Sequence, residues 1–158
     1  MTTPSERLVR LGIELPSVAA PVGAYVPALS HGGLVYTSGQ VPFVDGELAA
    51  VGLVGERQGD VSLERAAECA RICALNAIAA AAAAAGGIDN IIRVIRVTGY
   101  VASAPGFTAQ PAVINGASGV IGEIFGEAGI HARSAVGVPA LPLGAPVEVE
   151  LTVAVSTR

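Results

Sequence analysis

The sequence contains no lysine, because all nine of its basic residues other than histidine are arginines. Without a side-chain amine the chain cannot form a Schiff base with pyridoxal phosphate or with a carbonyl substrate. It also cannot complete a Walker A loop or a Ser-x-x-Lys acyl-transfer site. The motifs His-Glu-x-x-His and Gly-x-Ser-x-Gly are missing as well, which argues against zinc peptidases and hydrolases with an elbow serine.

Charged side chains are also scarce. They make up 14% of the sequence, and thirteen acidic against nine basic residues give a formal net charge of −4 and a pI near 5.1. Binding to a nucleic-acid backbone relies on clustered Lys or Arg. The arginines here are scattered, with no pair closer than Arg7/Arg10 and Arg93/Arg96, so we expect no nucleic-acid partner.

Only two cysteines are present, Cys69 and Cys73, four residues apart in a helical pattern of alanines. Without companion Cys or His at metal-ligand spacing they make a poor metal site, and adjacent turns of one helix are poorly oriented for a disulfide. We expect both thiols to pack in the core.

Long hydrophobic runs and a secretion signal are missing too. Charged residues interrupt the N-terminal segment from Glu6 to Glu14, where a signal peptide needs an apolar stretch. The longest apolar run, residues 77–85, is about half of what a bilayer requires. We expect a cytoplasmic protein with no membrane partner.

What is abundant is apolar surface: 52% of the 158 residues are hydrophobic and the mean hydropathy is +0.62. This composition is typical of a folded chain, and the length fits one domain. Soluble monomers usually carry about a quarter or more charged residues on their surface. One small domain cannot bury the excess, so the composition predicts a homo-oligomer.

Periodicity predicts an α+β fold in the order β-β-α-β-α-β-β, with both long helices on one face of the sheet. Residues 1–19 are expected to form an N-terminal extension with a short helix capped at Pro4 or Ser5, and residues 20–158 a single domain. The expected elements are a helix at 4–13, strands at 25–29 and 34–38, a surface excursion with a tight turn at Asp45-Gly46 over 41–60, a helix from Asp60 or Ser62 to Ala85, a strand at 91–101, a helix from Thr108 or Gln110 to Phe125, and strands at 133–138 and 147–153.

The last two strands carry the clearest polar pattern. Strict alternation over residues 147–153 points Glu148 and Glu150 away from the core, and we expect Arg133 to share their face. Ala135 beside it leaves a hollow next to a guanidinium that matches a carboxylate, which favours a small anionic ligand. The alternative is an ordinary ion pair, across strands or between subunits, of Arg133 with Glu148 or Glu150.

Other polar residues carry weaker signals. Asn115 lies mid-helix among small residues at a cost in stability, which ligand contact or close packing against a subunit must offset. The Ser38-Gly39 segment ends a strand where backbone groups can meet a ligand, although a simple turn explains it equally well. His31 and His131 fall in predicted loops, where solvated histidines are expected.

Together these residues resemble the RidA (YjgF-like) family of reactive-intermediate imine deaminases. The resemblance rests on Tyr25, the Tyr-Thr-Ser-Gly-Gln segment at residues 36–40, Asn115, the Ala-Arg-Ser-Ala-Val segment at 132–136, and Leu-Pro at 141–142 followed by Val-Glu-Val-Glu at 147–150. Order and spacing match over about residues 20–155. The block from the arginine to Glu-x-Glu is its specific part.

The resemblance implies a homotrimer of chorismate-mutase-like subunits, with the sheets forming a central barrel and the ligand clefts lying between subunits. It also implies that Arg133 binds a substrate carboxylate and that Glu148 lies near the water that attacks an imine. Four further matching positions would line the same cleft: Tyr25, Ser38, Gly39 and Asn115.

The leading interpretation is hydrolysis of small 2-imino or enamine acids to 2-oxo acids and ammonia, without metal or organic cofactor. Backbone groups near Gly39 and Ala135 would orient the imine and the water. Ala135 stands where the family's typical deaminases have a cysteine, so an alternative is a non-catalytic module that binds a small carboxylate metabolite. A third interpretation, an endoribonuclease or translation inhibitor, is disfavoured by the acidic charge and the absence of lysine.

Overall fold

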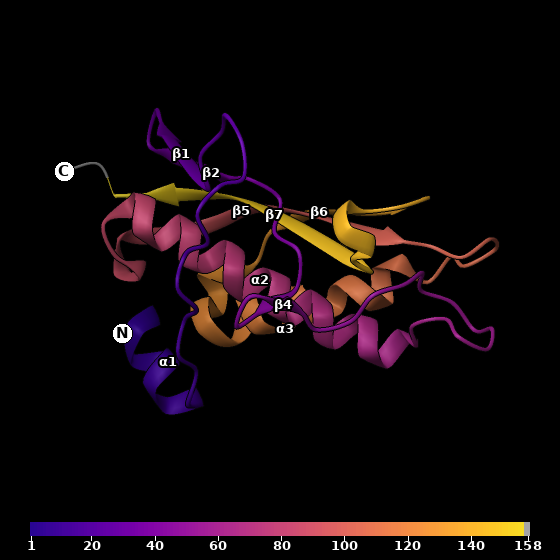
Figure 1. Ribbon diagram of the computed structural model, residues 1–158. Helices are drawn as coiled ribbons and strands as arrows, with labels where there is room; N and C mark the ends of the chain where they lie inside the picture. Colours follow the sequence, from indigo (N-terminus) through magenta and orange to yellow (C-terminus); the bar gives the residue numbers. More distant parts are fainter. Residues whose placement is uncertain (157–158) are drawn as a thin grey trace.

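A computed structural model describes residues 1–156 as a five-stranded sheet with two long helices on one of its faces (Figure 1). Neighbouring strands are antiparallel, except that β5 and β6 are parallel. In sheet order the strands are β1 (Ala28–His31), β2 (Leu34–Thr37), β7 (Val147–Val155), β5 (Ile91–Ala102) and β6 (Ala132–Val138). The predicted α+β fold and its element order are confirmed, and β6 lies at an edge.

The two long helices, α2 (Leu63–Ala85) and α3 (Gln110–Phe125), pack against each other beneath the sheet (Figure 1). The Ser62 hydroxyl caps α2 by accepting a hydrogen bond from the Arg65 N–H at 3.1 Å, and Gly86 ends it at a φ of 75°. A Cβ at Gly116 would collide with the Ala67 carbonyl oxygen. Gly116 therefore serves close packing of the two helices within one chain.

Helix α2 is long and apolar enough, by length and composition alone, to cross a membrane. In the fold it is a core helix, in contact with β7 and α3. Cys69 and Cys73 are fully buried in it, which confirms the prediction of core packing, and the Cys73 thiol donates to the Val147 carbonyl oxygen at 3.5 Å. Burial raises the pKa of Cys73 well above its usual range, so this thiol is an unreactive packing group.

A short helix, α1 (Pro4–Leu11), precedes the sheet and contacts α3. Its cap is Thr3, not Pro4 or Ser5: the Thr3 hydroxyl accepts from the Glu6 N–H at 3.2 Å while the Thr3 N–H donates to the Glu6 carboxylate at 2.9 Å. Ser5 instead donates its N–H and hydroxyl to Asp89 at 2.9 and 2.6 Å.

The segment between the first hairpin and α2 is only partly the expected surface excursion. Strands β3 (Phe43–Val44) and β4 (Glu47–Leu48) form a hairpin whose turn is Asp45-Gly46, both at positive φ as such a turn requires. Val54, however, is fully buried, and its N–H donates to the Ala102 carbonyl at 2.7 Å. This buried valine packs into the core, so the prediction is wrong for that part.

Three short 3₁₀ turns complete the described chain: η1 (Ile88–Asn90), η2 (Gly126–Gly129) and η3 (Pro142–Gly144). The turn η2 follows α3 directly and leads to β6, whereas η3 connects β6 to β7. These two turns thus flank β6, the strand that carries Arg133.

Candidate functional site

Arg133 and Glu148 lie on opposite faces of the sheet. Arg133 pairs in register with Val97 of β5, which in turn pairs with Leu151 of β7; both partners are buried against the helices. Glu148 pairs with Tyr100, whose neighbour on β6 is Val136, on the face without helices. Because residues paired in register point to the same face of a sheet, the expectation that Arg133 shares a face with the two glutamates is wrong.

The Arg133 side chain is held by helix α3. Its Nη1 donates to the Asn115 Oδ1 at 2.8 Å and to the Ser118 Oγ at 3.2 Å, and its Nη2 donates to the Pro111 carbonyl oxygen at 3.3 Å. These three acceptors follow one another at helical spacing, i, i+4 and i+7, and so share one side of α3. The low helix propensity of Asn115 is thus offset by its hydrogen bond to Arg133, which orients the guanidinium.

None of the acceptors of Arg133 is a carboxylate, so an ion pair with Glu148 or Glu150 within one chain is excluded, whereas the pair between subunits stays a prediction. Within residues 1–156 the ion pairs are Arg57–Asp60, Arg65–Glu68 and Arg71–Glu123. A guanidinium has five N–H donors, and the three bonds to α3 leave Nε–H and one Nη2–H without a partner in the described chain. Nε and Nη2 share one edge of the guanidinium, which suits a carboxylate.

His131 is not the solvated loop residue that the sequence suggested. It is half-buried, with Nδ1 at 2.6 Å from the Gly129 carbonyl oxygen and Nε2 at 3.0 Å from the Ser118 Oγ. His31, at the end of β1, is exposed as expected. Ser118 and His131 are therefore polar residues at this site that sequence reasoning missed.

The predicted hollow beside Arg133 is partly filled. Ala135 pairs with Gly99 on the helix face, where a Cβ on Gly99 would collide with Ile114. Two positions farther along β6, a Cβ on Gly137 would lie 2.7 Å from the Gln110 Nε2 and 2.9 Å from the Ser103 Oγ. Side chains of α3 and Ser103 therefore fill this part of the predicted hollow.

A second group of predicted residues meets at the start of β7. Gln40 pairs with Val149 and the Thr37 hydroxyl accepts from the Leu151 N–H at 2.9 Å, so Ser38 and Gly39 bulge opposite a single residue of β7. A Cβ on Gly39 would collide with the Glu148 carboxylate. Glycine at this position therefore lets the carboxylate lie against the backbone.

Tyr25 belongs to the segment that Ser38 holds in place. The Ser38 hydroxyl donates to the Val26 carbonyl oxygen at 2.6 Å, and its N–H donates to the Pro27 carbonyl oxygen at 2.8 Å. The predicted strand at 25–29 consequently begins only at Ala28. Tyr25 lies in a bend before it and is 55% exposed, available to a ligand or to another chain.

The carboxylates of Glu148 and Glu150 interact with each other on the face of the sheet without helices, called the open face below. Burial raises the pKa of Glu148, and the nearby charge of Glu150 raises it further. The Tyr100 hydroxyl donates to the Glu150 carboxylate at 3.2 Å, and burial followed by Glu150 raises the pKa of Tyr100. Glu148 is therefore a better proton acceptor than a solvated carboxylate.

Residues 5–154 match the family described as "YjgF/chorismate mutase-like, putative endoribonuclease". The chain belongs to this family. It is 41% identical over 149 residues to protein TCP17 of Trypanosoma cruzi, a match that covers 92% of this chain and 90% of that protein.

Solved structures of the YjgF-like family share the fold. A protein of Shewanella oneidensis described as a "putative endoribonuclease" is 36% identical, with a TM-score of 0.91 over 97% of this chain and 99% of that one. Escherichia coli TdcF, solved with bound serine, is 26% identical, with a TM-score of 0.61 over 89% of this chain and 94% of that one.

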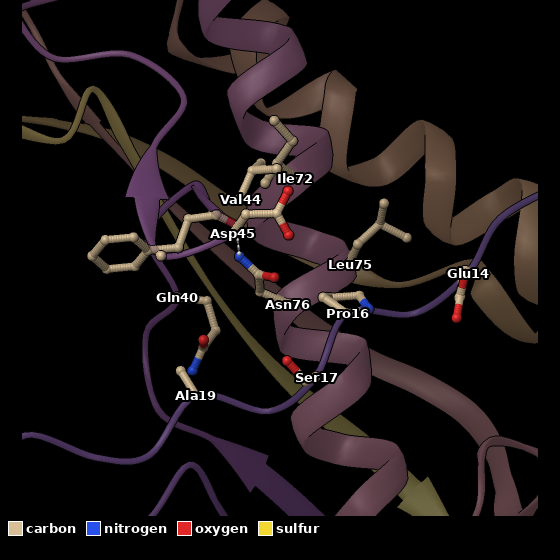
Figure 2. Close-up of a pocket in the computed structure, with 12 residues that line it drawn as sticks. Glu14, Pro16, Ser17, Ala19, Gln40, Val44, Asp45, Ile72, Leu75 and Asn76 are labelled. Atoms are coloured by element: carbon tan, nitrogen blue, oxygen red, sulfur yellow. Dashed lines mark hydrogen bonds between the residues drawn. The ribbon is translucent and has the colours of Figure 1, made fainter.

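A cavity of about 690 Å³ lies between the N-terminal segment and α2, with Gln40 of the second group of site residues in its lining (Figure 2). Figure 2 shows Pro16, Ser17 and Ala19 of the N-terminal segment facing side chains of α2 across it. The Asn76 amide forms part of its wall and donates to the carbonyl oxygens of Val41 and Phe43 at 3.2 and 3.1 Å. Neither Arg133 nor Glu148 lines this cavity.

Residues 1–156 contain no group of three or more His, Cys, Asp or Glu that is placed to hold a metal ion. The chemistry of the site residues is accordingly that of a guanidinium, a carboxylate with a raised pKa, hydroxyls and backbone groups. These groups can bind an anion and transfer protons.

Proposed function

We propose that this YjgF-like protein hydrolyses small 2-imino or enamine acids to the 2-oxo acid and ammonia, acting in the cytoplasm at sites shared between the subunits of a homotrimer. The observation that carries the proposal is the separation of Arg133 from Glu148. They point from opposite faces of the sheet, and strand β5 lies between their strands. A small ligand cannot touch both within one chain, so a site that uses both must combine two chains.

The arginine half of the site would bind the substrate carboxylate. Arg133 is fixed on α3 through Nη1 and Nη2 and keeps Nε–H and one Nη2–H for a ligand. Two parallel N–H···O bonds to a carboxylate are charge-assisted and orient the ligand as well as binding it. Asn115 would contribute by holding the arginine, and the backbone at Ala135 would help to orient the imine.

The glutamate half would transfer protons. Glu148, its pKa raised by burial and by Glu150, takes a proton from water while the water oxygen bonds to the carbon of the protonated imine. The C=N electron pair moves to nitrogen and gives a carbinolamine. Glu148 then returns the proton to nitrogen, the C–N bond breaks, and the hydroxyl proton returns to Glu148 as the carbonyl forms. The released ammonia takes this proton from Glu148, which regenerates the carboxylate, and the products are the 2-oxo acid and ammonium ion.

The proton-transfer half would be completed by the segment around the Gly39 bulge. Gly39 lies against the Glu148 carboxylate, so its backbone is near the water that Glu148 would activate. Ser38 holds the chain that carries Tyr25, whose exposed ring would cover the ligand.

Exposed apolar side chains on the open face support assembly into a trimer. Tyr36 and Val136, which pair with Thr152 and Tyr100 on that face, are 43% and 44% exposed in the single chain. Contact between three sheets would bury them. The same contact would bring the open face of one chain towards the β6 edge of its neighbour.

The relatives support a small carboxylate ligand more than RNA. TdcF was solved with serine, an amino acid with a free carboxylate. This chain has a net charge of −4 and no lysine, which disfavours binding to a polyanion. We therefore do not extend the endoribonuclease descriptions of relatives to this chain, and we propose no nucleic-acid or membrane partner.

A second candidate function is binding of a small carboxylate metabolite without turnover. It is favoured by one observation: Ala135 stands where the family's typical deaminases have a cysteine, so any contribution of a thiol is lost. Ligand binding by Arg133 does not depend on that position, since its three bonds are to α3.

The deciding experiment measures release of ammonia and oxo acid from 2-imino acids generated in the cuvette by an amino-acid oxidase, alongside calorimetric titration with pyruvate. Faster release than the spontaneous hydrolysis supports the deaminase. Binding of pyruvate without acceleration selects the binding module. A protein that neither binds pyruvate nor accelerates hydrolysis overturns both candidate functions.

A further inference from the structure

A chain of hydrogen bonds runs behind Arg133, away from its ligand-facing edge. It connects the Gly129 carbonyl oxygen to His131 Nδ1 at 2.6 Å, His131 Nε2 to the Ser118 Oγ at 3.0 Å, and the Ser118 Oγ to Arg133 Nη1 at 3.2 Å. Three elements contribute to it: the turn η2, helix α3 and the start of β6. Gly129 is buried and the three other members are half-buried, so water competes with these bonds less than at an exposed position.

The chemistry of each group sets the direction of this chain. A carbonyl oxygen only accepts, so His131 Nδ1 must carry the hydrogen of the bond to Gly129. An arginine only donates, so the Ser118 oxygen accepts from Nη1. The Ser118 hydroxyl hydrogen then has one acceptor among its partners, the unprotonated Nε2 of His131. Every bond is satisfied when His131 is neutral with its proton on Nδ1.

A doubly protonated His131 would break this pattern. Nε2 would then donate to the Ser118 oxygen, which already accepts from Arg133. One hydroxyl would lie between two cations, and its own hydrogen would lose its acceptor within the chain of bonds. The arrangement therefore belongs to a neutral His131 that acts on Arg133 through Ser118.

We propose that Ser118 and His131 are positioning residues that turn the Nε and Nη2 edge of Arg133 towards the substrate carboxylate. The inference rests on the proposed function, since it assigns how the carboxylate subsite is oriented. Ser118 occupies one Nη1–H and Asn115 the other, so no donor of Nη1 is left for a ligand. A carboxylate must then bind side-on to Nε and Nη2.

The binding test compares Ser118→Ala, Ser118→Thr and His131→Phe, with His31→Phe as matched control because His31 is the exposed histidine. Calorimetry with pyruvate measures the carboxylate subsite, and methyl pyruvate, which lacks the carboxylate charge, reports binding that does not involve Arg133. We expect Ser118→Ala and His131→Phe to weaken pyruvate binding about three- to tenfold, the scale of one hydrogen bond. Ser118→Thr keeps the hydroxyl and should stay within about twofold of the wild type.

Kinetics separate positioning from loss of structure. In Ser118→Ala we expect KM for the imino acid to rise by the same factor as the pyruvate Kd, with kcat nearly unchanged, because the proton-transfer half is on another chain. Loss of folded protein would instead lower the apparent kcat in proportion to the folded fraction and leave KM unchanged.

Nitrogen-15 NMR tests the chain of bonds without any ligand. With two histidines in the sequence, His31→Phe assigns the remaining signals to His131. We expect a protonated Nδ1 and an unprotonated Nε2 in His131, and a shift of the Nε2 signal in Ser118→Ala. This readout needs only the variant of the exposed His31, so it holds even if Ser118→Ala or His131→Phe fails to fold.

The outcomes distinguish this proposal from the proposed function. His131 found with its proton on Nε2, or wild-type pyruvate affinity retained in both Ser118→Ala and His131→Phe, overturns the positioning role alone. Wild-type protein that neither binds pyruvate nor accelerates imine hydrolysis contradicts the proposed function, and the positioning role with it.

Discussion

Arg133 and Glu148 point from opposite faces of one sheet, and strand β5 separates their strands. Each is nevertheless prepared for chemistry. Arg133 is bound to three neutral acceptors on α3 and keeps two donors, whereas Glu148 is half-buried against Gly39 with a raised pKa. This arrangement is the one expected if Arg133 of one chain and Glu148 of another act on the same ligand.

Replacing Arg133 by lysine should weaken carboxylate binding. An ammonium cannot reproduce the planar pair of donors, so we expect Arg133→Lys to lose about 1.5 to 3 kcal/mol of affinity for pyruvate in calorimetry. Arg71→Lys is the matched control, because Arg71 pairs with Glu123 on the surface of the helices. An Arg133→Lys protein that binds pyruvate as tightly as the control would remove Arg133 from the ligand site.

Replacing Glu148 by glutamine should separate turnover from binding. We expect Glu148→Gln to keep pyruvate affinity and to lose about a hundredfold or more in kcat, the scale for a general acid or base. Unchanged turnover would show that Glu148 transfers no proton in the reaction.

The same variant should change stability with a definite sign. The folded-state pKa of Glu148 is raised, so its protonated form favours folding, and that contribution is lost as pH rises through the raised value. Glu148→Gln, which resembles the protonated form, should therefore melt higher than the wild type at neutral pH, with the difference closing in acid. A lower melting temperature at neutral pH would show that burial does not disfavour the ionised form of Glu148.

The acid limb of the pH profile should depend on Glu150. Glu148 must be ionised to accept a proton, so turnover falls as pH drops through its raised pKa. The charge of Glu150 is the second cause of that raised value, after burial. Glu150→Gln should therefore move the acid limb of kcat/KM to lower pH, and an unmoved limb would show that Glu150 does not affect the proton acceptor.

The sequence predicts the order of elements and the family because both depend on patterns within single segments. The alternation over residues 147–153, the alanine-rich helix and the Asp45-Gly46 turn are each readable locally, and each is confirmed. The sequence motif from Arg133 to Glu150 can be recognised in the same way, because it lies on two strands that are consecutive in the chain.

The relation between Arg133 and Glu148 is not local and was predicted wrongly. Alternation tells which residues of one strand share a face of the sheet, but not which residues of another strand point to that same face. That depends on the register of β6 and β7 on β5, which lies between them in the sheet. The contact of His131 with Ser118 was missed for a similar reason, because η2 folds back on α3 over thirteen residues.

Complementation between two impaired variants, with imine hydrolysis measured at substrate concentrations below KM, tests the shared site most directly. Arg133→Lys and Glu148→Gln are each purified, checked for a trimer by light scattering, then unfolded, mixed in equal amounts and refolded together. In random mixed trimers about a quarter of the interfaces combine an intact Arg133 from one chain with an intact Glu148 from its neighbour. The account predicts recovery of up to about a quarter of wild-type imine hydrolysis in the mixture. A mixture of trimers no more active than its components, or a wild-type protein that is a monomer, would contradict it.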